Sequence, residues 1–244
     1  MLLSVGYGYS IAQICRFFKG FSAAVREGLA PEEKVCYNGK KAKGETSVKI
    51  YDITQEVFGC VVFGDDPAPE KQTLCDMAEG DLYNLTAFSM CAHNGTHLDA
   101  PAHFLRDGQT VEQIPLTHTV GPAYLTEHSG PLTAADAESV LAAAEAAQPE
   151  AARRILFKGS TVITLEAAEV FARAGVLLVG NESQTVGPED APMAVHLVLL
   201  GAGTVLLEGI RAAHVPCGVY LLNAAPLPLG GAEGAPCRAW LMAQ

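Results

Sequence analysis

Three histidines and an aspartate are concentrated in one short segment, and their spacing limits how the chain can fold there. The four residues are His93, His97, Asp99 and His103, all at odd positions. Because successive side chains of a strand point to opposite faces, an extended segment places all four on one face. A helix separates them, since Asp99 and His103 fall roughly 240° and 280° around the axis from His93. We therefore expect an extended segment that directs all four groups to one site.

Two further residues of this segment disfavour a helix. Gly95 lies on the same face as the histidines, where a missing side chain is expected to leave room for an ion or a substrate. Pro101 is expected to end the strand pairing and to turn the chain. His103 should then approach the site from a loop.

Imidazole nitrogens combined with a carboxylate suit a borderline divalent cation. Zinc is the first expectation and manganese or iron the alternative, whereas calcium and magnesium fit poorly. The competing interpretation is a set of separate, hydrogen-bonded core histidines without an ion. The density of metal-binding side chains in one segment favours the metal site.

The segment resembles a known family signature. Residues 93–103 match, position for position, the pattern His-x-Gly-Thr-His-x-Asp-x-Pro-x-His of the cyclase family of metal-dependent hydrolases, which includes bacterial kynurenine formamidase and isatin hydrolase. The similarity extends from residues 48–54 to residues 234–239. It implies an α/β protein with the swivelling β/β/α cyclase-family fold, a mixed sheet or barrel core and flanking helices. It also implies a homo-oligomer, either a dimer or a tetramer.

Two residues of the second half resemble the family's remaining metal ligands. His196 and Glu208 lie in the apolar run of residues 195–208. Glu208 ends a series of Val and Leu that we expect to form a buried strand, and an ionised carboxylate there is costly unless it is paired or bound to metal. By resemblance the full ligand set is His93, His97, Asp99, His196 and Glu208.

The resemblance also implies a role for each group. The first two histidines bind one ion, the two carboxylates bridge a pair of ions, and His196 completes the second position. His103 is the expected catalytic acid and base, which its near-neutral ordinary pKa allows. The implied reaction is hydrolysis of an amide by a metal-activated water.

Three functional interpretations follow. The first is an arylformamidase-like enzyme that hydrolyses an N-formyl arylamine such as N-formylkynurenine. The second is a hydrolase of a cyclic amide, imide or lactone, and the third is a catalytically idle metal-binding protein. The only tryptophan is Trp240, near the C-terminus. Candidate ring-stacking side chains are therefore phenylalanines and a tyrosine, Phe63 and Phe104 first, with Phe58 and Tyr83 as alternatives.

Composition narrows the class of protein. The 244-residue chain is 49% hydrophobic and 18% charged, with a net charge of −11. Such a chain can bury a good core, and without a basic stripe it is not expected to bind nucleic acid. No apolar run is long enough to cross a membrane. Its seven cysteines include no Cys-x-x-Cys pair, so neither a disulfide framework nor a structural zinc site is indicated, and we expect a cytoplasmic enzyme.

Charge divides the chain near residue 48. Residues 1–49 carry net charge +4, whereas the remainder is strongly acidic. We therefore expect an N-terminal extension at 1–47 and the hydrolase domain at 48–244. The extension is either a short helix, a disordered segment, or residues encoded upstream of a true start at Val48.

Residues 133–179 show an α/β pattern. A capping box at Thr133 and Asp136 predicts a helix reaching about Ala147. Residues 154–157 are expected to be a short strand. A second helix is expected to start after Thr164 and to stop at Gly175, followed by a buried strand over 176–179. Together these form a strand-helix-strand unit.

Overall fold

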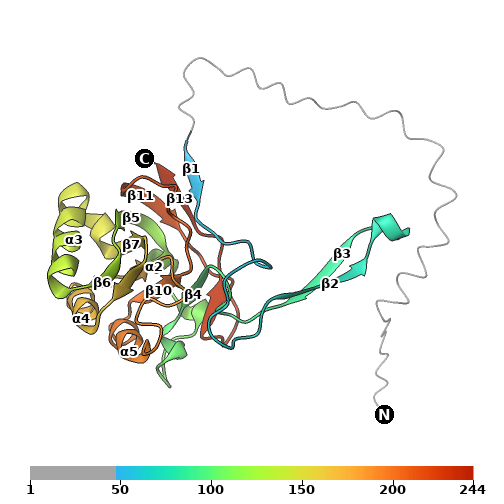
Figure 1. Ribbon diagram of the computed structural model, residues 1–244, viewed down its shortest axis with the longest axis horizontal. Coiled ribbons are helices and arrows are strands. Elements are labelled where there is room, and N and C mark those ends of the chain that lie inside the picture. Colours follow the sequence, from blue (N-terminus) through green and yellow to red (C-terminus); the bar gives the residue numbers. More distant parts are fainter. Residues whose placement is uncertain (1–47, 244) are drawn as a thin grey trace, which may run out of the picture. The chain divides into compact units, whose positions relative to one another are not determined.

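The computed structural model describes residues 48–243, which form two compact units (Figure 1). The smaller unit comprises Lys71–Phe88, and the larger comprises residues 48–70 and 89–243. The expected extension at residues 1–47 lies outside the described residues.

The smaller unit is a hairpin-like pair of strands. Strands β2 (Glu70–Cys75) and β3 (Leu85–Ser89) form a two-stranded sheet, and the 3-10 helix η1 (Met77–Glu79) lies between them in the chain. Asp76 caps this short helix by accepting a hydrogen bond from the Ala78 amide at 2.8 Å.

A nine-stranded mixed sheet is the framework of the larger unit. Its strands, in spatial order, are β1 (Ile50–Asp52), β13 (Trp240–Ala243), β11 (Gly218–Asn223), β5 (Val120–Glu127), β7 (Arg154–Lys158), β9 (Leu178–Gly180), β10 (Val205–Glu208), β4 (His97–Asp99) and β12 (Gly234–Pro236). Strands β5, β7, β9 and β10 are parallel to their neighbours within this group, and the flanking pairs are antiparallel. Strands β6 (Gly130–Leu132) and β8 (Thr161–Ile163) form a separate parallel pair.

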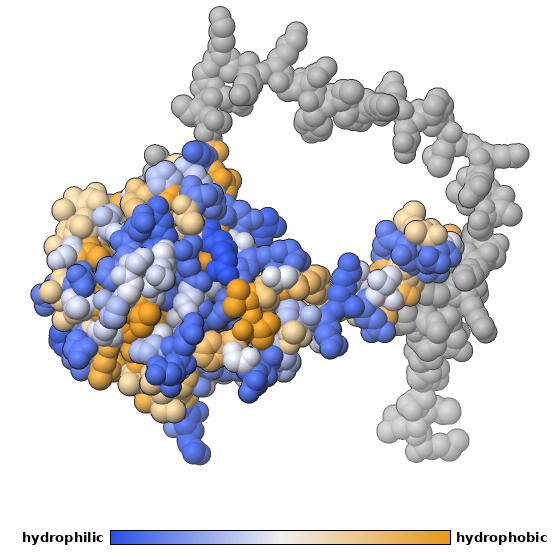
Figure 2. Space-filling view, in the orientation of Figure 1, coloured by the Kyte–Doolittle hydropathy of each residue, from blue (hydrophilic) through white to orange (hydrophobic). Residues whose placement is uncertain are grey.

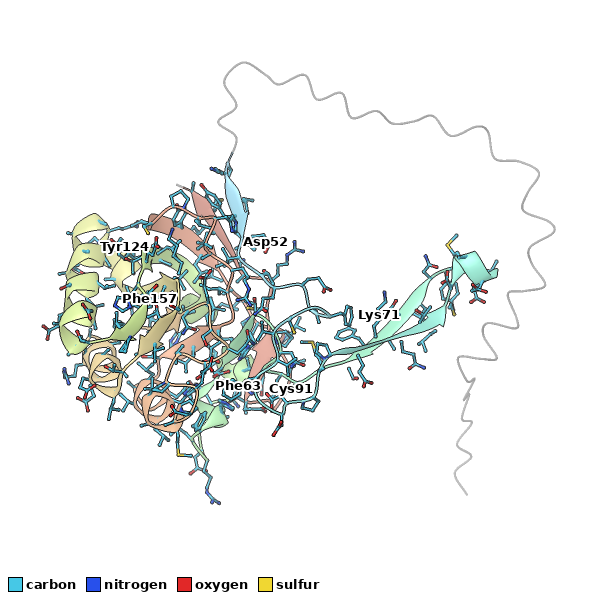
Figure 3. All side chains as sticks on the ribbon, in the orientation of Figure 1. Asp52, Phe63, Lys71, Cys91, Tyr124 and Phe157 are labelled. Atoms are coloured by element: carbon cyan, nitrogen blue, oxygen red, sulfur yellow. The ribbon has the colours of Figure 1, made fainter. Side chains whose placement is uncertain are left out.

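Helices lie mainly against one face of this sheet. They are α3 (Ala134–Ala147), α4 (Leu165–Arg173) and α5 (Met193–Gly201), with the short α2 (Leu116–Thr119) and the 3-10 helices η2 (Pro101–His103), η3 (Val111–Gln113) and η4 (Pro149–Arg153) as connections. One core cluster joins residues of α3, α4 and α5 to outward-facing residues of β7, β9 and β10. Phe157 of β7, labelled in Figure 3, is fully buried in this layer. Phe171 of α4 is also fully buried, and the two ring centroids are 6.1 Å apart.

Side chains on the opposite face of the sheet pack against one another. A second cluster combines Leu241 of β13, Leu125 of β5, Leu207 of β10 and Leu98 of β4, all fully buried. Side chains from strands near both ends of the sheet meet in one cluster because the sheet curls into a half-barrel. The structure thus confirms the predicted mixed sheet with flanking helices.

The strand-helix-strand prediction is confirmed with one shift. Helices α3 and α4 begin after the N-caps Thr133 and Thr164, and β7 and β9 are parallel neighbours. The strand expected at 176–179 was placed too early, since β9 begins at Leu178. The Val176 amide donates instead to the Phe171 carbonyl at 3.2 Å, which closes the C-terminus of α4.

The buried strand expected to end at Glu208 is confirmed, but the earlier part of the same apolar run is helical. Met193–Gly201 form helix α5, and only Val205–Glu208 form strand β10. A run that is apolar on every side has no period to separate a buried helix from a buried strand. Gly203, with φ +81°, makes the turn between them.

Surface features agree with a packed interior. Figure 2 shows hydrophilic residues over much of the visible face of the larger unit, with apolar residues between them. Cys60, Cys91, Cys217 and Cys237 form no disulfide. No helix within residues 48–243 is long and apolar enough to span a membrane.

The cap of α3 gives a test of the fold. Thr133 Oγ1 accepts from the Asp136 amide at 3.2 Å, and Asp136 Oδ2 accepts from the Thr133 amide at 2.9 Å. We expect Thr133→Ala to lower the free energy of unfolding by about 1 kcal/mol, because a helix-end amide loses its acceptor. Thr133→Ser, which keeps the hydroxyl, is the control in urea denaturation. Equal stability of the two variants would contradict the role of this cap.

Candidate metal centre

Two adjacent strands place the central acidic and imidazole groups. In the antiparallel pair β4 and β10, Glu208 lies opposite His97 and Leu206 lies opposite Asp99. Leu98 points into the half-barrel core, so His97 and Asp99 point to the helix-covered face. Helix α5 packs on β10 and brings His196 to the same face.

The sequence expectation of one extended face holds for only part of the segment. His97 and Asp99 share a face of β4, as expected. His93 was expected on the same strand but lies in the preceding turn. His103 ends the 3-10 helix η2, which begins at Pro101, so it approaches from a connection as predicted.

Gly95 has a different role from the one expected. Its φ is +68°, and a Cβ there would lie 3.0 Å from Cys60 Cβ. A side chain is therefore excluded by backbone conformation and by close packing, and not by space kept for an ion. The Gly95 carbonyl contacts the His97 ring at 3.0 Å and accepts from the side-chain Nε2 of Gln184 at 2.9 Å.

The carboxylate of Asp99 faces two groups of imidazoles. Its Oδ1 lies 2.9 Å from His93 Nδ1 and 3.4 Å from His97 Nε2. Its Oδ2 lies 3.6 Å from His196 Nε2 and 4.0 Å from His103 Nε2. One oxygen is thus directed to each side of the cluster.

Glu208 repeats this arrangement. Its Oε2 lies 3.4 Å from His97 Nε2, and its Oε1 lies 3.3 Å from His196 Nε2. Oε1 also accepts from the Val186 amide at 2.8 Å, which fixes the carboxylate. The two carboxylates therefore link a His93/His97 side to a His196 side.

Burial makes this concentration of charge expensive unless cations compensate it. Asp99, Glu208, His97 and His196 are at most 3% exposed. His97 Nε2 and Asp99 Oδ2 are buried without any hydrogen-bond partner. Buried polar atoms aimed at a common centre fit a divalent cation, as does the set of nitrogen and oxygen donors. Two overlapping groups can hold an ion: His93, His97 and Asp99, and Asp99, His196 and Glu208.

Backbone contacts set the orientation of two imidazoles. His97 Nδ1 lies 3.0 Å from the Gly95 carbonyl, and His196 Nδ1 lies 2.9 Å from the Pro192 carbonyl. Each contact fixes a ring and leaves Nε2 directed to the cluster, which is the usual outer contact of a metal-binding histidine.

The cluster shifts the pKa values of its members. Burial alone lowers the pKa of His97 and His196, but the adjacent carboxylates of Asp99 and Glu208 outweigh it and raise both to about 10. Burial raises the pKa of Asp99, but the three nearby imidazoles outweigh it and hold the pKa well below its ordinary value. Burial lowers the pKa of His103, which favours the neutral ring.

His103 and Phe104 form the border of the cluster. The His103 side chain is 28% exposed, and its ring stacks on that of His93 with centroids 4.2 Å apart. Phe104 contacts the rings of both His103 and His196, at 4.5 and 4.8 Å between centroids. The structure thus brings Phe104 to the site.

Phe63 lies at a neighbouring cavity. This cavity of about 380 Å³ is lined by residues of the β1–β2 loop and of the segments that follow β9 and β10. Phe63, labelled in Figure 3, lines this cavity. Gln184 also lines it and donates a hydrogen bond to Gly95 in residues 93–96, the segment before β4 that we call the ligand loop. Of the alternatives, Phe58 is 42% exposed and Tyr83 belongs to the smaller unit.

Glu233 is a site residue that the sequence analysis missed. Its Oε1 lies 3.2 Å from His93 Nε2, the ring nitrogen opposite the one that faces Asp99. Gly234 makes this approach possible, since a Cβ there would lie 2.8 Å from His93 Cε1. The only local signal is an acidic residue in a glycine-rich stretch, which is too common to identify a site.

Comparison with known proteins gives a consistent family. The Cyclase family model matches residues 47–188. Kynurenine formamidase of Salinibacter ruber is 36% identical over 219 residues, which cover 79% of this chain and 96% of that protein. A solved structure described as a potential metal-dependent hydrolase with cyclase activity is 28% identical, with a TM-score of 0.67 over 81% of this chain and 99% of that one.

The fold also matches isatin hydrolase A of Labrenzia aggregata. That structure has a TM-score of 0.67 and 22% identity, and the match covers 80% of this chain and 93% of that one. The family match spans more than half of the sequence, and the 36%-identical relative is covered almost completely. The chain therefore belongs to the cyclase family of hydrolases.

Proposed function

We propose that this chain is a metal-dependent amidohydrolase that acts on an N-formyl arylamine, as the names of its kynurenine formamidase relatives suggest. The observation that carries the proposal is the pair of buried carboxylates, each with one oxygen toward either side of an imidazole cluster. Carboxylates that face two ways suit bridging positions between two cations.

In this proposal five residues hold one or two ions, with zinc first and manganese as the alternative. They are His93, His97, Asp99, His196 and Glu208. A bound divalent cation supplies Lewis acidity, which activates water and polarises a carbonyl oxygen. We further propose that Glu233 orients the His93 ring by its contact at 3.2 Å.

His103 is the proposed proton carrier. Its lowered pKa keeps the ring neutral and able to accept a proton near neutral pH. It takes a proton from the attacking water and delivers it to the leaving nitrogen. The carbon–nitrogen bond of the formamide breaks, the water oxygen joins the formyl carbon, and formate and a free arylamine result. Phe104 packs edge-on against the His103 ring, with ring centroids 4.5 Å apart.

A second candidate is hydrolysis of a cyclic amide, imide or lactone. The fold shared with isatin hydrolase favours it, and the same cluster and His103 serve the same chemistry. A cytoplasmic homo-oligomer with a small-molecule substrate completes the proposal.

Metal analysis and substrate trials on one preparation test the function. We expect one or two equivalents of zinc or manganese per chain, and hydrolysis of N-formylkynurenine that stops on chelation and returns with metal. Turnover of cyclic amides alone selects the second candidate. Absence of metal affinity would overturn the assignment of the cluster.

Two variants separate metal binding from proton transfer. We expect His103→Ala to lower kcat roughly 100-fold or more with metal content nearly unchanged, because a general acid and base is lost. Asp99→Ala should instead release metal. Elemental analysis and steady-state kinetics check both, and full turnover by the first variant would exclude His103 as the proton carrier.

Metal binding should also release protons. Imidazoles with pKa values raised from 6.5 to about 10 are protonated at pH 7, and only the neutral ring binds metal. A raised pKa also means that the stability contributed by these protonated rings is complete below pH 6.5 and is lost as pH rises toward 10. Because protons compete with zinc for these rings, zinc affinity should increase as pH rises from 6.5 toward 10. Titration calorimetry at pH 7 in buffers of different ionisation enthalpy measures the protons, and zero release would contradict these pKa shifts.

A further inference from the structure

The cavity beside the cluster contains a cation that the proposed hydrolysis does not use. Arg211 lines this cavity together with Phe63 and Gln184. It follows the metal-centre residue Glu208 by only three positions. Gln184 reaches from the cavity wall to the Gly95 and His93 carbonyls, at 2.9 and 3.4 Å. The cavity is therefore next to the ligand loop.

One side of the Arg211 guanidinium donates hydrogen bonds to backbone carbonyls, and the other side can receive a ligand. Nη1 donates to the carbonyls of Glu182 and Ile210, at 2.9 and 2.8 Å. The Arg211 amide donates to the Ile53 carbonyl at 2.8 Å, which anchors the backbone. Among residues 48–243, neither Nε nor Nη2 of Arg211 has a hydrogen-bond partner. These two nitrogens form one edge of the planar guanidinium, and such an edge matches the two oxygens of a carboxylate.

No carboxylate of the described part of the chain neutralises this arginine. Glu182 lines the same cavity, but its Oε1 accepts from the amides of Ala212 and Ala213 and its Oε2 accepts from the amide of Gly159. Both of its oxygens are thus occupied by backbone. In a chain of net charge −11, a half-buried arginine without an ion pair is unusual, because burial of a charge favours pairing.

The remaining lining suits the other parts of an amino acid that carries an aromatic ring. Val61, Val62 and Phe63 form an apolar wall, and the exposed Glu189 supplies a second carboxylate at the cavity. A cavity of about 380 Å³ lies within the range of small-molecule sites.

We propose that this cavity binds the amino-acid end of the substrate, with the substrate carboxylate on Nε and Nη2 of Arg211. The inference rests on the proposed amide hydrolysis and makes it more specific, because it selects aryl formamides that carry a carboxylate. Glu189 is placed to attract the ammonium group of the same substrate.

The test compares two substrates that differ only in the carboxylate. They are N-formylkynurenine and N-formylkynuramine, which keeps the ammonium group and lacks the carboxylate. For Arg211→Gln we expect kcat/KM on N-formylkynurenine to fall roughly 10- to 100-fold, mainly through KM, as loss of a hydrogen bond to a charged group predicts. On N-formylkynuramine the change should stay within about threefold, and Arg211→Lys should recover part of the loss because it restores the charge.

Arg173→Gln is the matched control. It removes the same charge from the exposed surface of α4, where Arg173 pairs with Glu169 at 3.5 Å. An equal loss on both substrates in Arg211→Gln would overturn the proposal and assign Arg211 a structural role through the Glu182 and Ile210 carbonyls.

Direct binding distinguishes failure of this inference from failure of the proposed function. Calorimetry on metal-loaded protein compares kynurenine with kynuramine in the native chain and in Arg211→Gln. Absence of formamide hydrolysis would reject the proposed reaction. The carboxylate site would still stand if kynurenine binds at least 10-fold more tightly than kynuramine, and does so only when Arg211 is present. Equal binding of the two amines by the native chain would exclude the carboxylate site.

Discussion

Two buried carboxylates on neighbouring strands are the interaction on which the rest of the structure depends. Asp99 and Glu208 are almost completely buried, and their negative charges must be compensated within the protein. The imidazoles that surround them supply part of this compensation, which explains the raised pKa values of His97 and His196. The same arrangement leaves His97 Nε2 and Asp99 Oδ2 buried without hydrogen bonds, which fits the proposed binding of a divalent cation.

The curled sheet makes this arrangement possible. The register between β4 and β10 places Glu208 opposite His97. Because side chains alternate along β4, Leu98 points into the half-barrel core, and His97 and Asp99 point toward the helices. Helix α5 then covers the carboxylates and adds His196. Glycines permit the closest approaches: a Cβ on Gly209 would lie 2.3 Å from the Gly95 carbonyl oxygen. The site is therefore assembled by packing as much as by ligand chemistry.

The proposed reaction and the proposed substrate recognition occupy different parts of the same region. In the proposed reaction, His103 at the border of the carboxylate cluster moves a proton between water and the leaving nitrogen, and Phe104 contacts its ring. Arg211 lies in the adjoining cavity, where an unpaired cation in an acidic chain favours an anionic group. Gln184 lines this cavity and donates to the carbonyl of Gly95, between His93 and His97, so the cavity adjoins the cluster.

The sequence by itself determined the groups with strong local signals. Side-chain spacing in residues 93–103, the cap at Thr133 and the helix start after Thr164 depend on near neighbours in the chain, and the cap and the helix start are confirmed. Only the tertiary structure decided that residues 193–201 are a helix, that His93 comes from a turn, and that Glu233 and Arg211 reach the region of the site. A uniformly apolar run has no periodicity to read, and contacts between residues more than a hundred positions apart arise from sheet order and packing, which no local pattern encodes.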